Sequence, residues 1–180
     1  LFVKTIKEPE TNEITGGIFA SKAGLIALEA KVVIDCTGDA DVAYEAGVMT
    51  KTGRDQDGFT QPATLFFQVR GVNKAKVEEY RANNPEPDSL QFSKLVEKAR
   101  KNGDFPIQRE KLGVYESVLP GVWRVNTTRI LNVDSSNPEE VTKALIEGRK
   151  QVQIVLKFMR KYVPGFEDVE LVDTASQLGV

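Results

Sequence analysis

The strongest structural signal in the sequence is an amphipathic pattern between Asn137 and Gly165. Asn137 suits the N-cap of a helix, Pro138 the first helical position and Glu140 the third. Apolar residues then recur at helical spacing: Val141, Leu145, Val152, Val155, Leu156, Met159 and Val163. The pattern predicts one helix of about 25 residues and ~38 Å, which ends at Pro164-Gly165.

Strand patterns predict that the long helix belongs to an α+β fold. Three short strands are expected at residues 1–6, 14–21 and 25–28, which form an antiparallel β-meander. Gly16-Gly17 in the second of them predicts a bulge or a close approach of two backbones. The meander is expected to lie apart from the main sheet.

A second group of elements follows the meander. A long strand is expected from Pro62 to Val72, because Leu65, Phe67 and Val69 alternate with more polar residues. Further strands are expected at 114–118, 122–126, 129–133 and 169–174, and surface helices at 74–83 and 89–102. We therefore expect a mixed or antiparallel sheet that helices, including the long one, cover on one side.

The connection between these two parts carries a possible nucleotide turn. Val32 to Ile34 predicts a buried strand, Thr37-Gly38 a turn, and Asp39 the N-cap of a short helix that ends at Gly47. Such a turn lets backbone approach a bound nucleotide, but a purely structural strand–helix connection is the alternative. Cys36 follows an apolar run, which favours an inert buried thiol over a redox thiol.

The same stretch carries a family resemblance. Residues 32–43, VVIDCTGDADVA, resemble the VIDATGDGDVA segment of bacterial FAD-dependent oxidoreductases with a glutathione-reductase-like flavin domain. Four more segments resemble motifs of that family: TQPATL at 60–65, NTTR at 126–129, EGRKQV at 147–152 and YVPGFE at 162–167. Cys36 and Ala40 depart from the family's Ala and Gly. Both are small, so the turn should survive, with positive φ disfavoured at Ala40.

The resemblance implies FAD as the cofactor and Thr37, Gly38 and Asp39 as cofactor-binding residues. It assigns residues 1–49 to an FAD-binding domain and 50–180 to a substrate-binding domain. The G-x-G-x-x-G fingerprint, which lies upstream in that family, is absent. We interpret the chain, which starts at Leu1, as a segment of a longer polypeptide. By itself it should be inactive and bind FAD weakly or not at all.

A looser set of polar residues predicts a substrate site: Gln61, Thr64, Gln68, Asn126, Thr127, Thr128 and Arg129. If the strand from Pro62 lies near the strand that ends at Asn126, these residues share one sheet face. Arg129 would then bind a carboxylate or similar anion bidentately. Ordinary strand-end polarity with an Arg salt bridge is the alternative. Likewise, the polar loop 50–61 is either a surface loop or a loop over a ligand.

The composition of the chain excludes several classes of partner and of catalytic site. The 180 residues are 41% apolar and 28% charged, with a net charge of −2 and no basic block, so we expect no nucleic acid partner. No apolar run reaches membrane-spanning length and no signal peptide is evident, so no membrane partner and a cytoplasmic location are expected. The absence of His removes His-based triads and metal sites.

Two functions therefore compete. The first is the substrate-binding middle segment of an FAD-dependent oxidoreductase that transfers a hydride from a small organic substrate to flavin. Its partners would be that substrate and the remainder of its own chain. The second is a non-catalytic α+β binding or interaction module. No spacing identifies catalytic residues, and Asp39 with Asp41 fits helix capping better than a metal pair, so no metal is expected.

Overall fold

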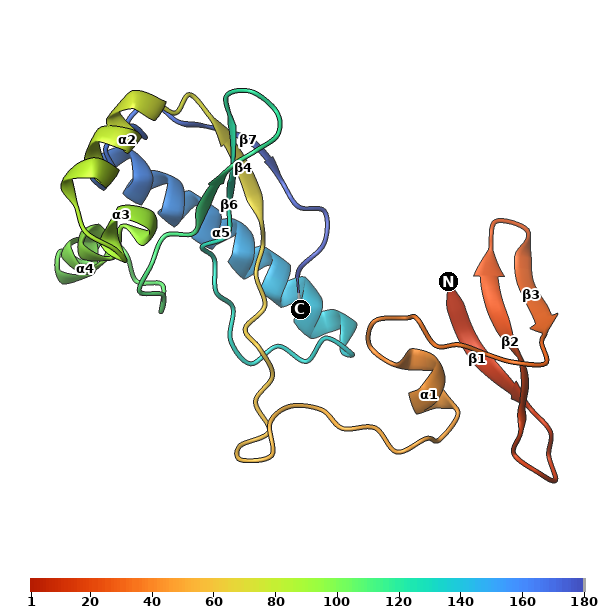
Figure 1. Ribbon diagram of the computed structural model, residues 1–180. Coiled ribbons are helices and arrows are strands. Elements are labelled where there is room, and N and C mark those ends of the chain that lie inside the picture. Colours follow the sequence, from red (N-terminus) through yellow and green to blue (C-terminus); the bar gives the residue numbers. More distant parts are fainter. Residues whose placement is uncertain (180) are drawn as a thin grey trace. The chain divides into compact units, whose positions relative to one another are not determined.

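The computed structural model describes residues 1–179, and the chain forms two compact units, Leu1–Gly58 and Phe59–Val180 (Figure 1). We call them the N-terminal and the C-terminal unit. The described residues contain one antiparallel sheet of three strands and another of four, together with five helices. The predicted α+β class is confirmed.

The N-terminal unit is built on the predicted meander. Its strands are β1 (Phe2–Lys7), β2 (Ile14–Ser21) and β3 (Gly24–Glu29), paired in the order β1-β2-β3. A Cβ on Gly16 would lie 2.2 Å from the carbonyl oxygen of Leu28, so the predicted close approach at Gly16 is confirmed. The short helix α1 (Asp41–Glu45) is tied to β1, because the Glu45 carboxylate accepts hydrogen bonds from the backbone N–H (2.6 Å) and hydroxyl of Thr5.

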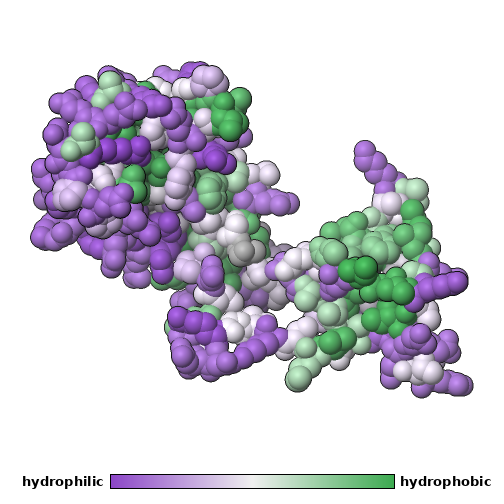
Figure 2. Space-filling model, viewed as in Figure 1, coloured by the Kyte–Doolittle hydropathy of each residue, from purple (hydrophilic) through white to green (hydrophobic). Residues whose placement is uncertain are grey.

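The predicted buried strand at Val32 to Ile34 is wrong. These residues form no strand, and Val32 and Ile34 are 75% and 79% exposed. A strand needs a neighbour for its backbone hydrogen bonds, and within residues 1–179 this run has none. Cys36 is exposed rather than buried, for the same reason. Figure 2 shows that apolar residues gather at the surface of this unit.

The start of α1 also differs from expectation. Ala40, not Asp39, occupies the N-cap position, and no side chain at that position accepts a capping hydrogen bond. Ala40 has φ 59°, the left-handed conformation that its side chain disfavours. The hydrogen bonds that compensate for this come from Asp35 and Thr37, as described below.

The C-terminal unit contains the four-stranded sheet, in the order β5-β6-β4-β7. Its strands are β4 (Phe67–Arg70), β5 (Val114–Glu116), β6 (Val122–Val125) and β7 (Glu170–Thr174). The strand expected from Pro62 is regular only in β4; upstream, Ala63 bridges Ile130 and Thr64 bridges Gly179. The strand expected at 129–133 is reduced to that one bridge at Ile130.

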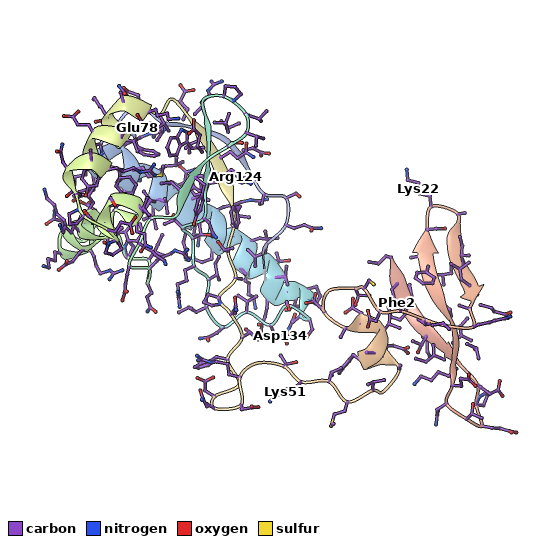
Figure 3. The ribbon with its side chains drawn as sticks, in the orientation of Figure 1. Phe2, Lys22, Lys51, Glu78, Arg124 and Asp134 are labelled. Carbon is purple, nitrogen blue, oxygen red and sulfur yellow. The ribbon has the colours of Figure 1, made fainter. Side chains whose placement is uncertain are left out.

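The alternation predicted along β4 is confirmed. Leu65, Phe67 and Val69 are at most 1% exposed and belong to the core between sheet and helices. Trp123 on β6 faces the same core, whereas its neighbour Arg124, labelled in Figure 3, is exposed.

The helices of this unit are α2 (Lys74–Asn83), α3 (Asp88–Gln91), α4 (Ser93–Lys101) and α5 (Pro138–Tyr162). Figure 1 shows α5 running behind the sheet, with α2, α3 and α4 grouped near one end of it. α5 has the predicted N-cap, since Asn137 Oδ1 accepts from the N–H groups of Glu139 (3.0 Å) and Glu140 (3.4 Å). The helix expected at 89–102 is instead interrupted by Phe92 at φ 52°, whose side chain is fully buried.

Candidate functional site

Three of the matched motifs meet in the C-terminal unit. We call the place the polar junction, and define it as residues 63–65, 126–130 and 147–151. The Thr64 hydroxyl donates to Asn126 Oδ1 at 3.0 Å and lies 3.0 Å from the Thr128 hydroxyl. The structure therefore brings the TQPATL and NTTR segments together, although 62 residues separate Thr64 from Asn126.

The side chains of two threonines in the NTTR segment make hydrogen bonds to backbone groups and do not face solvent. The Thr128 hydroxyl accepts from the N–H of Leu65 at 2.7 Å and lies 3.1 Å from the Leu65 carbonyl. The Thr127 hydroxyl accepts from the N–H of Gly113 at 3.0 Å. Both side chains are fully buried, and a hydroxyl with one proton has little capacity left for a ligand. Thr127 and Thr128 thus support the junction.

Arg129 is held by α5. Its N–H donates to Gln151 Oε1 at 2.7 Å, and Gln151 Nε2 donates to the carbonyl of Arg129 at 3.0 Å and to Glu147 Oε1 at 3.1 Å. Gln151 is buried. The helix comes close here because Gly148 has no side chain: a Cβ there would lie 3.0 Å from Leu65 Cβ.

A second arginine, Arg109, lies on the segment that Gly113 joins to residues 126 and 127. Arg109 precedes Gly113, whose carbonyl accepts from the N–H of Asn126 at 2.8 Å. Burial, followed by the positive charge of Arg129, lowers the pKa of Arg109. The Arg109 Nε is buried and has no hydrogen-bond partner among the described residues. Neither guanidinium lies within ion-pair distance of a carboxylate in residues 1–179, so the salt-bridge alternative for Arg129 finds no support there.

Sequence reasoning missed Glu147 and Gln151 as parts of the polar junction, and it missed Arg109 on the neighbouring segment. The resemblance of EGRKQV to a family motif marked the segment of Glu147 and Gln151 but not their contacts, and nothing in the sequence marked Arg109. Gln61, a predicted site residue, is exposed and makes no hydrogen bond with the described residues, so the structure does not bring it into the junction. Gln68 lies on β4, opposite Arg124 of β6.

In the N-terminal unit, Asp35 organises the predicted cofactor turn. Its carboxylate accepts from the N–H (3.0 Å) and hydroxyl (2.7 Å) of Thr37 and from the N–H of Ala43 (2.9 Å). The Thr37 hydroxyl in turn accepts from the N–H of Asp41 at 2.8 Å. These hydrogen bonds, the one from the Thr37 backbone first, lower the pKa of Asp35. Asp35 and Thr37 therefore do the capping that we expected of Asp39.

The three predicted cofactor residues consequently differ in what they can offer. Both donors of Thr37 are occupied by Asp35, whereas the N–H groups of Gly38 and Asp39 have no acceptor among the described residues. Gly38 has φ 91°, and a Cβ built on it meets no atom within 4 Å. The turn thus has two N–H donors without an acceptor in the described residues and free space at the Gly38 Cβ position, which fits a close approach of a cofactor.

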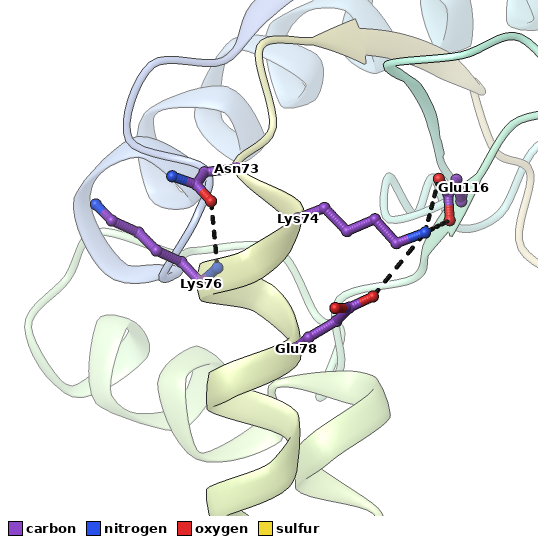
Figure 4. A network of polar contacts seen from close by, with 5 residues as sticks. All are labelled: Asn73, Lys74, Lys76, Glu78 and Glu116. Atoms are coloured by element: carbon purple, nitrogen blue, oxygen red, sulfur yellow. Dashed lines mark hydrogen bonds and ion pairs between the residues drawn. The ribbon is translucent and has the colours of Figure 1, made fainter.

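A separate cleft of about 410 Å³ lies elsewhere on the C-terminal unit, lined by Lys74, Glu78, Arg81, Leu90, Val114, Tyr115, Glu116 and Trp123. Figure 4 shows Lys74 between Glu116 (2.9 Å) and Glu78 (3.9 Å). Glu116 raises the pKa of Lys74, so two carboxylates compensate this lysine. None of the predicted site residues lines the cleft.

Two general properties complete the description. Within residues 1–179, no three or more His, Cys, Asp or Glu side chains are grouped so that they could hold a metal ion. No helix in the same residues has both the length and the apolar character to cross a bilayer.

The protein is therefore an α+β protein with a hydrogen-bonded turn around Asp35 in its N-terminal unit and the polar junction in its C-terminal unit. The family model for FAD dependent oxidoreductases matches residues 1–180. The chain therefore belongs to the FAD-dependent oxidoreductase family. No significant match was found among curated proteins or among solved structures.

Proposed function

We propose that this chain is the substrate-binding middle segment of a bacterial FAD-dependent oxidoreductase with a glutathione-reductase-like flavin domain. The enzyme would transfer a hydride from a small organic substrate to the flavin. The observation that carries this proposal is that TQPATL, NTTR and EGRKQV meet at the polar junction, where the Arg129 guanidinium has no carboxylate partner in the described residues. Gln151 of one motif fixes the backbone of Arg129 in another, which favours a binding site at this arginine.

The proposal assigns different tasks to the two units. Residues 1–49 would form part of the flavin domain, with Thr37 shaping the turn and the N–H groups of Gly38 and Asp39 available to the cofactor. FAD, when bound, supplies the electron chemistry through its isoalloxazine ring. Residues 50–180 would hold and orient the substrate through the polar and cationic groups of the polar junction.

The proposal also includes the remainder of the polypeptide as a partner. β3 is exposed along its whole length, and Val32 and Ile34 are exposed as well. Figure 2 shows apolar residues at the surface of this unit. Exposed apolar surface of this kind is usually covered in the functional protein. We propose that further segments of the flavin domain cover it.

The visible spectrum of the longer polypeptide that contains this chain tests the proposal. We expect a bound flavin that is bleached anaerobically by a small organic substrate. A purified, folded polypeptide that neither contains flavin nor takes it up on reconstitution would favour the non-catalytic binding module instead.

A further inference from the structure

The loop that carries Arg109 is fixed from both sides. The N–H of Arg109 donates to the carbonyl of Ile107 at 2.8 Å, and Arg100 Nη2 donates to the carbonyl of Arg109 at 2.5 Å. Further along, the N–H of Leu112 donates to the carbonyl of Gln91 at 2.8 Å. The backbone of Arg109 is therefore positioned before any ligand binds.

The loop is also attached to the NTTR segment. Gly113 makes hydrogen bonds to both Asn126 and Thr127, and a Cβ on Gly113 would lie only 2.5 Å from the carbonyl oxygen of Asn126. The glycine permits this contact, so the segment 109–113 and the segment 126–129 form one continuous rim. Arg109 and Arg129 are carried by the two segments of this rim.

Several side-chain N–H donors of this rim have no hydrogen-bond acceptor among the described residues. Arg109 Nε is buried without a partner, and the Arg129 guanidinium makes no hydrogen bond or ion pair with the described residues. Asn126 Oδ1 is engaged by Thr64, whereas its Nδ2 has no acceptor in the same part of the chain. Glu147, a carboxylate close to the Arg129 backbone, accepts from Gln151 instead.

Such an arrangement is unfavourable without a ligand. Burying a donor without an acceptor carries a desolvation penalty, and burial is the first cause that lowers the pKa of Arg109, with the positive charge of Arg129 second. An oxyanion offsets both effects, because its oxygens accept several N–H groups and its negative charge compensates the positive charges.

We propose that Arg109 and Arg129, with the amide Nδ2 of Asn126, form an oxyanion subsite that binds a carboxylate or phosphate group of the substrate. That the bound anion is part of the substrate rests on the proposed function, whereas anion binding is a property of the chain itself. The subsite makes the substrate class a small organic acid or phosphate ester.

The test is a titration of the 180-residue chain with inorganic phosphate and, separately, with succinate, at constant ionic strength. Arg Nε–Hε signals in ¹H–¹⁵N spectra and calorimetry report binding. We expect saturable binding of at least one anion, with a shift of the Arg109 Nε–Hε signal. The preferred anion distinguishes a phosphate ester from a carboxylic acid.

Four variants localise the site. Arg109→Gln and Arg129→Gln should each weaken binding by about tenfold or more, as expected for loss of a charge-assisted hydrogen bond. Arg124→Gln removes the same charge from an exposed position on β6 and should bind like the unmodified chain. Arg109→Lys keeps the positive charge but not the planar guanidinium with its paired N–H donors. Its affinity for the anion should therefore lie between those of Arg109→Gln and the unmodified chain.

Thermal unfolding with and without anion controls for folding, because a ligand that binds the native state raises the unfolding temperature. The inference is overturned if neither anion binds, or if Arg124→Gln weakens binding as much as Arg109→Gln. Flavin in the longer polypeptide with no anion binding by the chain would refute the subsite and leave the proposed function standing. Anion binding by the chain with no flavin in the longer polypeptide would refute the proposed function and leave the subsite standing.

Discussion

Gln151 on α5 holds both backbone polar groups of Arg129, accepting from its N–H at 2.7 Å and donating to its carbonyl at 3.0 Å. The side-chain amide thus takes the place that a neighbouring strand would occupy. This explains why the strand expected at 129–133 is reduced to a single bridge at Ile130. It also links the geometry of the polar junction to the long helix α5.

Replacement of Gln151 by Ala should destabilise the C-terminal unit. Two backbone groups of Arg129 would lose their partner, and each buried group left unsatisfied costs about 1–3 kcal/mol. We expect a loss of about 2–4 kcal/mol in the free energy of urea unfolding. Gln153→Ala, at an exposed position of the same helix, is the matched control and should change it little. Equal effects of the two variants would contradict the role assigned to Gln151.

Gly148→Ala should also destabilise the protein, although Ala usually stabilises a helix interior relative to Gly. The added Cβ would lie 3.0 Å from Leu65 Cβ and 3.3 Å from Leu65 Cδ2, and Leu65 is fully buried. We expect a net loss of about 1–3 kcal/mol, typical of an overpacked core. The penalty should shrink in a Leu65→Ala background, which a double-mutant cycle measures. A stabilised Gly148→Ala variant would show that the helix can move away.

Thr128 offers a comparison between a hydroxyl and a methyl group. Thr128→Val keeps the shape but removes the acceptor for the Leu65 N–H, so we expect a loss of about 1–3 kcal/mol. Thr128→Ser keeps the hydroxyl and should retain that hydrogen bond. If amide exchange at Leu65 is equally slow in both variants, the Thr128 hydroxyl is not what protects this backbone group.

The turn around Asp35 should respond to acid. Its pKa is lowered in the folded chain, mainly by the N–H of Thr37, so its stabilising effect is present above the ordinary carboxyl value of 3.8. The effect is lost as the pH falls through the lower, folded value. We expect the amides of Thr37 and Ala43 to lose exchange protection together in that range. In Asp35→Asn, this acid-dependent change should be absent at both amides.

Gly38→Val should lower the flavin content of the longer polypeptide. Gly38 has φ 91°, which a β-branched residue adopts only with strain, and its side chain would enter the open space beside the turn. The ratio of flavin to protein absorbance measures the effect, and circular dichroism checks that the fold is retained. Arg129→Ala is the comparison: it should keep the flavin and raise KM or lower kcat. Normal flavin content in Gly38→Val would remove the cofactor assignment.

Several elements follow from local sequence because their signals are local. Asn137, Pro138 and the apolar stripe define α5 from cap to last turn, and the alternation of Leu65, Phe67 and Val69 identifies the buried face around β4. Polar turns at 8–13 and 21–24 separate the meander strands. Each of these patterns acts over a few residues, within the range of backbone and side-chain preferences.

Other features depended on the folded chain. Phe92 takes a left-handed conformation and ends α3, because its ring is buried against Tyr80 and Phe166, and that burial outweighs a local cost of about 1–2 kcal/mol. Val32 to Ile34 has strong strand propensity but no neighbouring strand within residues 1–179. Propensity alone does not form a strand whose backbone groups lack partners.

The sequence by itself determined the α+β class, the meander, the long helix and the motifs that indicate an FAD-dependent oxidoreductase. Only the tertiary structure decided which residues of those motifs meet. Arg129 and Gln151 lie 22 residues apart along the chain and meet beside the Gly148 contact, and the Gly113 contact joins the segment of Arg109 to Asn126. No local preference encodes such a meeting, because it depends on how closely a helix and two loops pack around one core.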